Sequence, residues 1–126
     1  MVATDAGGVL RGYLSDDQSF RYVKQLERDN LIVPLVGDFA GGKAIRAVGD
    51  YARSHGATVT TFYVSNVEEY LRQDDRWLRF CENVASLPLD DTSTFIRSVR
   101  GRTPTGAFTL MSELAPVVRD IKSCAN

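Results

Sequence analysis

The chain has 126 residues, of which 44% are hydrophobic and 25% are charged, and its formal net charge is −1. This length and composition are typical of one globular domain and exclude an intrinsically disordered chain. The near-neutral charge argues against a general nucleic-acid binder, and no apolar run is long enough to predict a membrane span.

The N-terminal part of the sequence predicts a flexible lead-in followed by a helix. Residues 1–13 are rich in glycine and have no periodicity, so we expect a single α/β domain over residues 14–126. Residues 15–29 have a helical apolar stripe, with Ser15 placed to cap the helix N-terminus. Asn30 follows as a residue that can adopt the left-handed conformation that ends a helix.

The middle of the sequence predicts two strands around an amphipathic helix. The run Leu31–Val36 is apolar throughout, except for Pro34 at an edge or bulge position, and predicts a parallel strand that is buried on both faces. Residues 43–54 repeat apolar side chains at helical spacing. Residues 57–64 are β-branched or aromatic, which is typical of a strand.

The remaining elements are predicted from capping and composition. Ser65 and Glu68 have the spacing of a capping box, which would open a helix that is broken near Gln73 and resumes to residue 85. The last predicted segments are a strand over 93–99, a loop over 100–106 and a helix over 112–122.

The resulting order, α-β-α-β-α-β-α, predicts a three-layer α-β-α fold. Strands that alternate with helices favour a small, mostly parallel sheet with right-handed crossovers. We therefore expect an α/β protein that resembles half of a Rossmann domain, with any ligand bound beyond the carboxyl ends of the strands.

Three groups of residues are candidates for such a ligand site. Glycines between residues 37 and 43 allow close backbone approach, and the next helix offers free N–H groups, although Ala44 after Lys43 excludes a P-loop. No acidic residue lies between Asp91 and Glu113, so the arginines there favour an anion. The candidate ligand-binding residues are Gly37, Asp38, Gly41, Lys43, Ser65, Asn66, Arg97, Arg100 and Arg102.

Each group also has a structural interpretation. The glycine-rich segment is more typical of a tight turn, with Asp38 as a cap for the following helix. Ser65 and Asn66 fit a helix cap, and the arginines fit a solvated basic loop.

The two cysteines, Cys81 and Cys124, belong to no CxxC or Cys/His cluster, so the sequence predicts no metal site. We expect two reduced thiols in a cytoplasmic protein, since the N-terminal residues lack the features of a signal peptide.

Three segments in order resemble a known family. They are Asn30–Gly41, Phe62–Leu71 and Ser93–Val99. Together they are similar to the C-terminal half of an uncharacterised family of longer bacterial proteins, whose preceding half looks like the opening of a class I methyltransferase. The resemblance implies a methyltransferase-like, Rossmann-type relative without its cofactor loop, and it assigns no reaction and no cofactor. Gly42 departs from the family pattern, which has proline before the lysine.

Two functions from different classes follow. The first is a domain that binds a small anionic or nucleotide-like ligand at the sheet edge. The alternative is a non-enzymatic, homo-oligomeric interaction module, because open sheet edges favour pairing with a second copy. The aromatic residues Tyr70, Trp77 and Phe80 on one broken helical segment also favour a homodimer.

Overall fold

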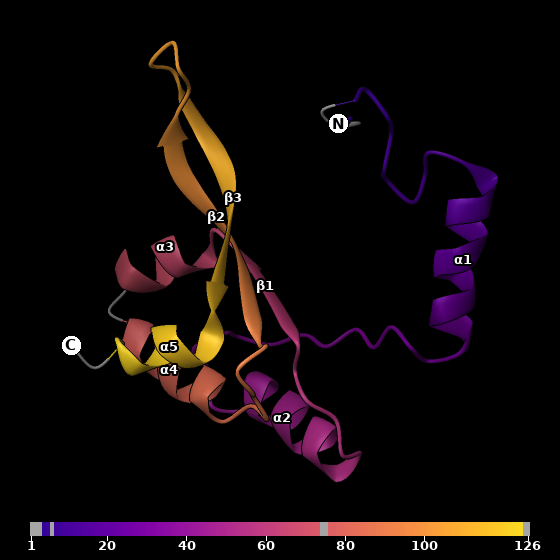
Figure 1. Ribbon diagram of the computed structural model, residues 1–126. Helices are drawn as coiled ribbons and strands as arrows, with labels where there is room; N and C mark the ends of the chain where they lie inside the picture. The colour runs from indigo at the N-terminus through magenta and orange to yellow at the C-terminus, as the bar shows by residue number, and fades with distance from the viewer. Residues whose placement is uncertain (1–3, 6, 74–75, 125–126) are drawn as a thin grey trace. The chain divides into compact units, whose positions relative to one another are not determined.

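The computed structural model describes residues 4–5, 7–73 and 76–124 (Figure 1). The chain divides into two compact units, Met1–Leu35 and Val36–Asn126. The predicted division into a lead-in over residues 1–13 and one domain from residue 14 stays a prediction.

The first unit contains helix α1 (Asp17–Arg28). Its N-cap is Asp16 and not the predicted Ser15, because the Asp16 carboxylate accepts a hydrogen bond from the Ser19 backbone N–H at 2.8 Å. The Ser19 N–H and hydroxyl lower the pKa of Asp16. Asn30 has a φ of 55°, so the predicted left-handed end of the helix is confirmed.

The predicted strand over Leu31–Val36 is wrong. These residues form no strand, and their apolar side chains are exposed, with Val36 fully so. No described residue of the first unit is buried. An apolar run indicates a buried strand only where another strand is available to pair with it, and here the run stays outside any sheet.

The second unit contains the sheet and the remaining helices. Its elements in chain order are α2 (Ala44–Ser54), β1 (Thr61–Ser65), α3 (Val67–Gln73), α4 (Trp77–Ala85), β2 (Thr94–Arg102), β3 (Phe108–Pro116) and α5 (Val117–Lys122). The predicted helix over 43–54 is confirmed within one residue. The predicted strand over 57–64 is confirmed as a strand, but it begins four residues later, at Thr61, and ends at Ser65. The predicted broken helix corresponds to α3 and α4.

The end of the chain differs from the prediction. Strand β2 continues through Arg102, so it includes the start of the predicted loop over 100–106. Strand β3 replaces the first half of the predicted helix over 112–122, and only α5 remains helical. A tight turn joins the two strands, with Gly106 at a φ of 85° and the Thr103 N–H donating to Ala107 O at 2.8 Å.

The sheet is mixed, with strand order β1-β2-β3. Strand β1 runs parallel to β2, and β3 runs antiparallel to β2 with Phe95 opposite Ala115 and Arg102 opposite Phe108. The predicted mostly parallel, three-layer, Rossmann-like half domain is therefore wrong. The hairpin between β2 and β3 replaces the crossover helix that a second parallel pair requires.

Within the second unit, helices α3, α4 and α5 lie on the same side of the sheet (Figure 1). The core forms between these helices and the sheet, where Phe80, Val84, Phe95 and Val117 are almost completely buried. Helix α2 packs on α4 so closely that a Cβ at Gly49 would lie 3.0 Å from the Ser86 carbonyl oxygen.

A disulfide joins Cys81 on α4 to Cys124, which lies just beyond α5. The prediction of two free thiols is wrong. Disulfides persist in oxidising compartments and are rare in the cytosol, so the bond does not favour the predicted cytoplasmic location. No helix in the described part of the chain is long and apolar enough to cross a membrane.

A buried amide on α4 holds the segment before α2. The side chain of Asn83 is buried, and its amide nitrogen donates to Phe39 O at 3.0 Å and to Gly41 O at 2.8 Å. Its oxygen accepts from Arg46 Nε at 3.0 Å. Each hydrogen-bonding group of this side chain is thus satisfied by a residue far away in the sequence.

We expect Asn83→Ala to lower the free energy of unfolding by about 1–3 kcal/mol, because two buried carbonyl groups lose their donor. Chemical denaturation measures the change. Glu82→Ala, an exposed neighbour on the same helix, is the matched control and should change stability by less than about 0.5 kcal/mol. Equal stability of the two variants would contradict this role for Asn83.

Candidate functional site

Two predicted site residues, Ser65 and Asn66, lie where β1 ends. Ser65 lies opposite Arg97 after an irregularity in the β1–β2 register, and its φ of 50° is unusual for a residue that is not glycine. Its hydroxyl is 3.5 Å from Asn66 Oδ1. Helix α3 begins at Val67, so the predicted capping box of Ser65 with Glu68 is wrong, and the Glu68 side chain is used elsewhere.

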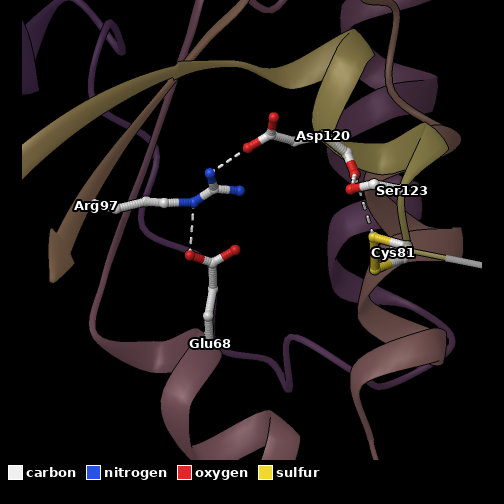
Figure 2. Close-up of a disulfide and its surroundings, with 6 residues drawn as sticks. Glu68, Cys81, Arg97, Asp120 and Ser123 are labelled. Carbon is white, nitrogen blue, oxygen red and sulfur yellow. Dashed lines mark hydrogen bonds and ion pairs between the residues drawn. A yellow bond between two sulfur atoms is a disulfide. The ribbon is translucent and has the colours of Figure 1, made fainter. Parts of the chain in front are cut away.

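Glu68 forms part of an ion-pair cluster around Arg97 (Figure 2). Arg97 Nε lies 2.6 Å from Glu68 Oε2, and Arg97 Nη1 donates to Asp120 Oδ2. The three side chains come from α3, β2 and α5, and their exposed fractions are only 13%, 12% and 23%. The cluster therefore fastens helices α3 and α5 to the central strand β2.

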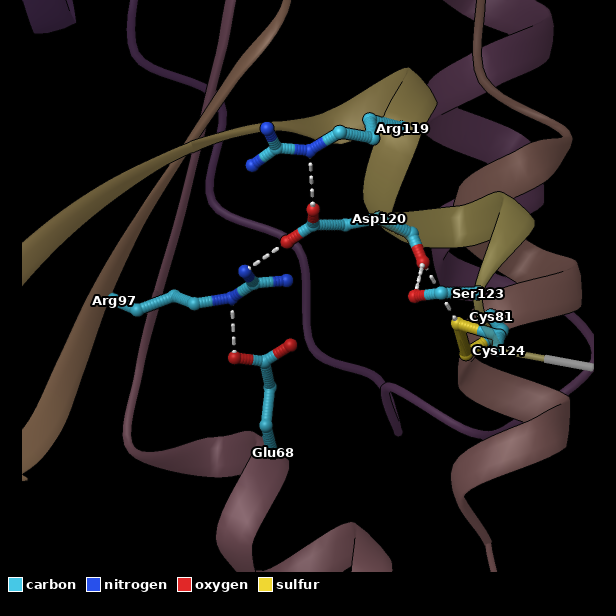
Figure 3. A network of polar contacts seen from close by, with 7 residues as sticks. All are labelled: Glu68, Cys81, Arg97, Arg119, Asp120, Ser123 and Cys124. Carbon is cyan, nitrogen blue, oxygen red and sulfur yellow. Dashed lines mark hydrogen bonds and ion pairs between the residues drawn. A yellow bond between two sulfur atoms is a disulfide. The ribbon is translucent and has the colours of Figure 1, made fainter. Parts of the chain in front are cut away.

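The three side chains of this cluster carry one positive and two negative charges. Burial disfavours the charged guanidinium, but the hydrogen bond to Asp120 and the charge of Glu68 outweigh it and raise the pKa of Arg97. Arg119 lies 3.5 Å from the second oxygen of Asp120 at the exposed side of the cluster (Figure 3). Glu68 Oε1 is buried and has no hydrogen-bond partner among the described residues.

The other two predicted arginines lie farther along the hairpin. Arg100 Nη2 is 2.6 Å from Glu69 Oε1, so a carboxylate from α3 already neutralises it. Arg102 lies over the ring of Phe108, 4.6 Å from the ring centroid, in a cation–π contact. The sequence predicted a basic segment over residues 97–102. It could not show that Arg97 and Arg100 are neutralised, because their carboxylate partners come from elements distant in the sequence.

The glycine-rich segment before α2 forms a tight turn. The Ala40 N–H donates to Asp38 Oδ1 at 3.0 Å, and the Gly41 N–H donates to Asp38 O at 3.0 Å. Asp38 also forms an ion pair with Arg76. A Cβ at Gly37 would lie 2.2 Å from the Cβ of Ala44, so packing alone requires glycine there.

Lys43 occupies the N-cap of α2 and makes no side-chain capping hydrogen bond. The turn is held against α4 by Asn83, whereas Ser65, Asn66, Arg97 and Arg100 gather where β1, α3 and β2 meet. No hydrogen bond or ion pair of the described residues joins the two groups. No group of three or more metal-binding side chains occurs in the described ranges either.

A larger feature that the sequence did not predict is the bare side of the sheet. Tyr63, Ile96 and Leu114 are cross-strand neighbours, and Leu110 and Phe108 continue the same face of β3. We call these five residues the open face. Four of them are between 62% and 77% exposed, and Ile96 is half-buried. No helix of residues 36–126 covers the open face, and the hairpin extends beyond the helices (Figure 1).

The sheet also has a free edge at β3. Thr103 donates to Ala107 and Val117 donates to Ser93, so in this register the odd-numbered residues of β3 face β2. The backbone groups of Leu110, Ser112 and Leu114 then point away from β2. These groups are free to pair with another strand. Charged side chains oppose such pairing, and β3 has only one, Glu113.

The family model of DUF7790, a domain of unknown function, matches residues 1–117. Because the match covers most of the chain, the chain belongs to this family. The description of the family assigns no activity, ligand or partner. No curated protein matches the chain.

We expect Arg97→Met to lower the free energy of unfolding by about 3–5 kcal/mol, because it leaves two nearly buried carboxylates without their cation. Arg100→Met removes an exposed ion pair and should cost at most about 1 kcal/mol. Urea unfolding measures both changes.

A double-mutant cycle tests the cause of this loss. Glu68→Gln in the Arg97→Met background should restore part of the lost stability, because one uncompensated charge disappears. If the two substitutions are simply additive, the cluster does not act as an electrostatic unit.

Proposed function

For this member of the DUF7790 family, we propose that the domain is a non-enzymatic interaction module that forms a homodimer through the open face. The observation that carries the proposal is the row of exposed apolar side chains on a sheet that has helices on one side only. Exposed apolar patches of this kind are typical of protein–protein interfaces.

The size of the open face is consistent with a weak dimer. Strands β2 and β3 have nine residues each and are about 30 Å long, whereas β1 has five residues and widens the sheet to about 14 Å over only part of that length. This area provides somewhat less than half of the ~800 Å² that each partner of a standard complex buries. A dimer that dissociates at micromolar concentrations fits such an interface.

Charge complementarity favours a second copy as the partner. The exposed Arg102 lies near the hairpin turn, and the exposed Asp90 and Asp91 precede β2 at the opposite end of the sheet. In a face-to-face pair with a twofold axis across the strands, the arginine end of one copy meets the acidic end of the other. Pairing through the free edge of β3 would leave the apolar side chains of the open face exposed. Packing of the two faces buries these side chains, so we favour it.

The anionic-ligand hypothesis is the weaker candidate. The bare N-terminus of α2 next to Lys43 supports it. Against it, the carboxylates of Glu68, Asp120 and Glu69 already satisfy Arg97 and Arg100. The methyltransferase-like relationship stays a prediction, since the family description assigns no activity.

Sedimentation equilibrium from about 1 to 100 μM tests the proposal, because this range brackets weak-dimer affinities. We expect a reversible monomer–dimer equilibrium that Leu114→Lys shifts to monomer by at least tenfold in Kd. The lysine introduces a like charge on both sides of the twofold interface.

Leu78→Lys is the matched control. Leu78 is an equally apolar and similarly exposed residue, 58% against 69% for Leu114, but it lies on α4. It should leave the dimer unchanged. A monomeric wild type, or equal weakening by both variants, would overturn the proposal.

A further inference from the structure

The disulfide joins the core to the last described helix of the chain. Cys81 lies in the middle of α4 and is only 6% exposed, whereas Cys124 follows α5 and is half-buried. The two cysteines are separated by 43 positions in the sequence, and their Cα atoms are 6.2 Å apart. One sulfur of the bond therefore belongs to the core and the other to a short terminal element.

We propose that Cys124 is a thiol–disulfide exchange site, and that an external thiol such as glutathione releases α5 from the rest of the domain when it reacts there. This inference concerns the side of the sheet opposite the open face and is independent of the proposed dimer.

The exchange is chemically balanced. The thiolate of glutathione attacks Cys124 Sγ, the more accessible sulfur, and forms a mixed disulfide as the bond to Cys81 breaks. The electron pair of the broken bond leaves with Cys81 Sγ, which takes a proton from solvent. A second glutathione thiolate can attack the mixed disulfide, which yields oxidised glutathione and the Cys124 thiol. Each step consumes only the external thiol named here.

Helix α5 is short enough to depend on its attachments. It spans six residues, far fewer than an isolated helix needs for stability in water. Its attachments include the buried side chain of Val117 and the packing of Ile121 against the core. The ion pair of Asp120 with Arg97 and the disulfide also hold it (Figure 2). The disulfide lies nearest the free end, so opening the bond removes the last anchor of the helix.

The disulfide and the ion-pair cluster are neighbours. The Ser123 hydroxyl donates to Asp120 O at 2.7 Å, and Cys124 Sγ lies 3.7 Å from the same oxygen (Figure 3). Asp120 is thus held from its backbone by the segment that carries Cys124 and from its side chain by Arg97. When the segment leaves, Arg97 keeps Glu68 and loses Asp120, so the buried cluster goes from net −1 to net zero.

The experiment compares the oxidised and reduced full chain. Intact-mass and peptide mass spectrometry after incubation with glutathione should show one adduct, located on Cys124. Hydrogen exchange of the dithiothreitol-reduced protein should be at least tenfold faster than that of the oxidised protein for amides in 120–124. Amides of β2 between residues 94 and 99 should keep their protection, because the hairpin does not depend on the disulfide.

Variants separate a local release from general unfolding. Cys124→Ser should reproduce the exchange pattern of the reduced wild type without any thiol present. Asp120→Asn with the disulfide intact should show a smaller increase in 120–124, because the covalent attachment remains.

Three results would overturn the inference. They are an adduct on Cys81, unchanged exchange in 120–124 after reduction, and loss of protection in β2 together with α5. The last result would make the disulfide a global staple of the fold. Because reduction of the wild type needs no substitution, a variant that fails to fold does not prevent the test.

Discussion

The sheet of this domain is buried on one face only, and this constraint governs the rest of the second unit. Phe95 at the centre of the core packs beside Phe62 from β1, with ring centroids 5.8 Å apart, and Phe62 in turn packs beside Phe80 from α4, with centroids 6.2 Å apart. With the helices of this unit on that side, the opposite face keeps Tyr63 and Leu114 in solvent. A protein with an apolar face of this kind gains free energy by covering it, which is why the open face dominates the functional interpretation.

Local sequence signals were reliable where the neighbourhood of a residue decides its structure. The amphipathic pattern of α2 and the left-handed residue Asn30 at the end of α1, whose φ is 55°, depend on nearby residues and were predictable. The segment Leu110–Leu114 consists largely of residues with good helix propensity, yet it is a strand because β2 pairs with it. Gly101 falls in the predicted loop over 100–106, but it lies in β2, where a Cβ would come 2.7 Å from the sulfur of Met111.

The candidate site was less predictable because its chemistry depends on charges that meet only after folding. Arg97 could be singled out from the sequence, but its partners Glu68 and Asp120 are 29 positions before it and 23 positions after it. The same reasoning applies to Asn83, whose amide groups are satisfied 37 to 44 positions away. Cysteine spacing likewise carried no sign of the bond between Cys81 and Cys124, since pairing depends on geometry and not on spacing.

The segment from β3 to α5 connects the open face of the sheet to the core on its other side. Strand β3 presents Leu110 and Leu114 to solvent, turns inward at the buried Ala115, and continues directly into α5 through the buried Val117. The strand that forms much of the open face is therefore anchored at its end by the core, and the helix that follows is anchored by the disulfide. Ala115 and Val117 are buried and take no part in the disulfide, so we expect β3 to keep its place when the last turn of the chain is released. Release of α5 and assembly through the open face are consequently separable properties of one continuous segment.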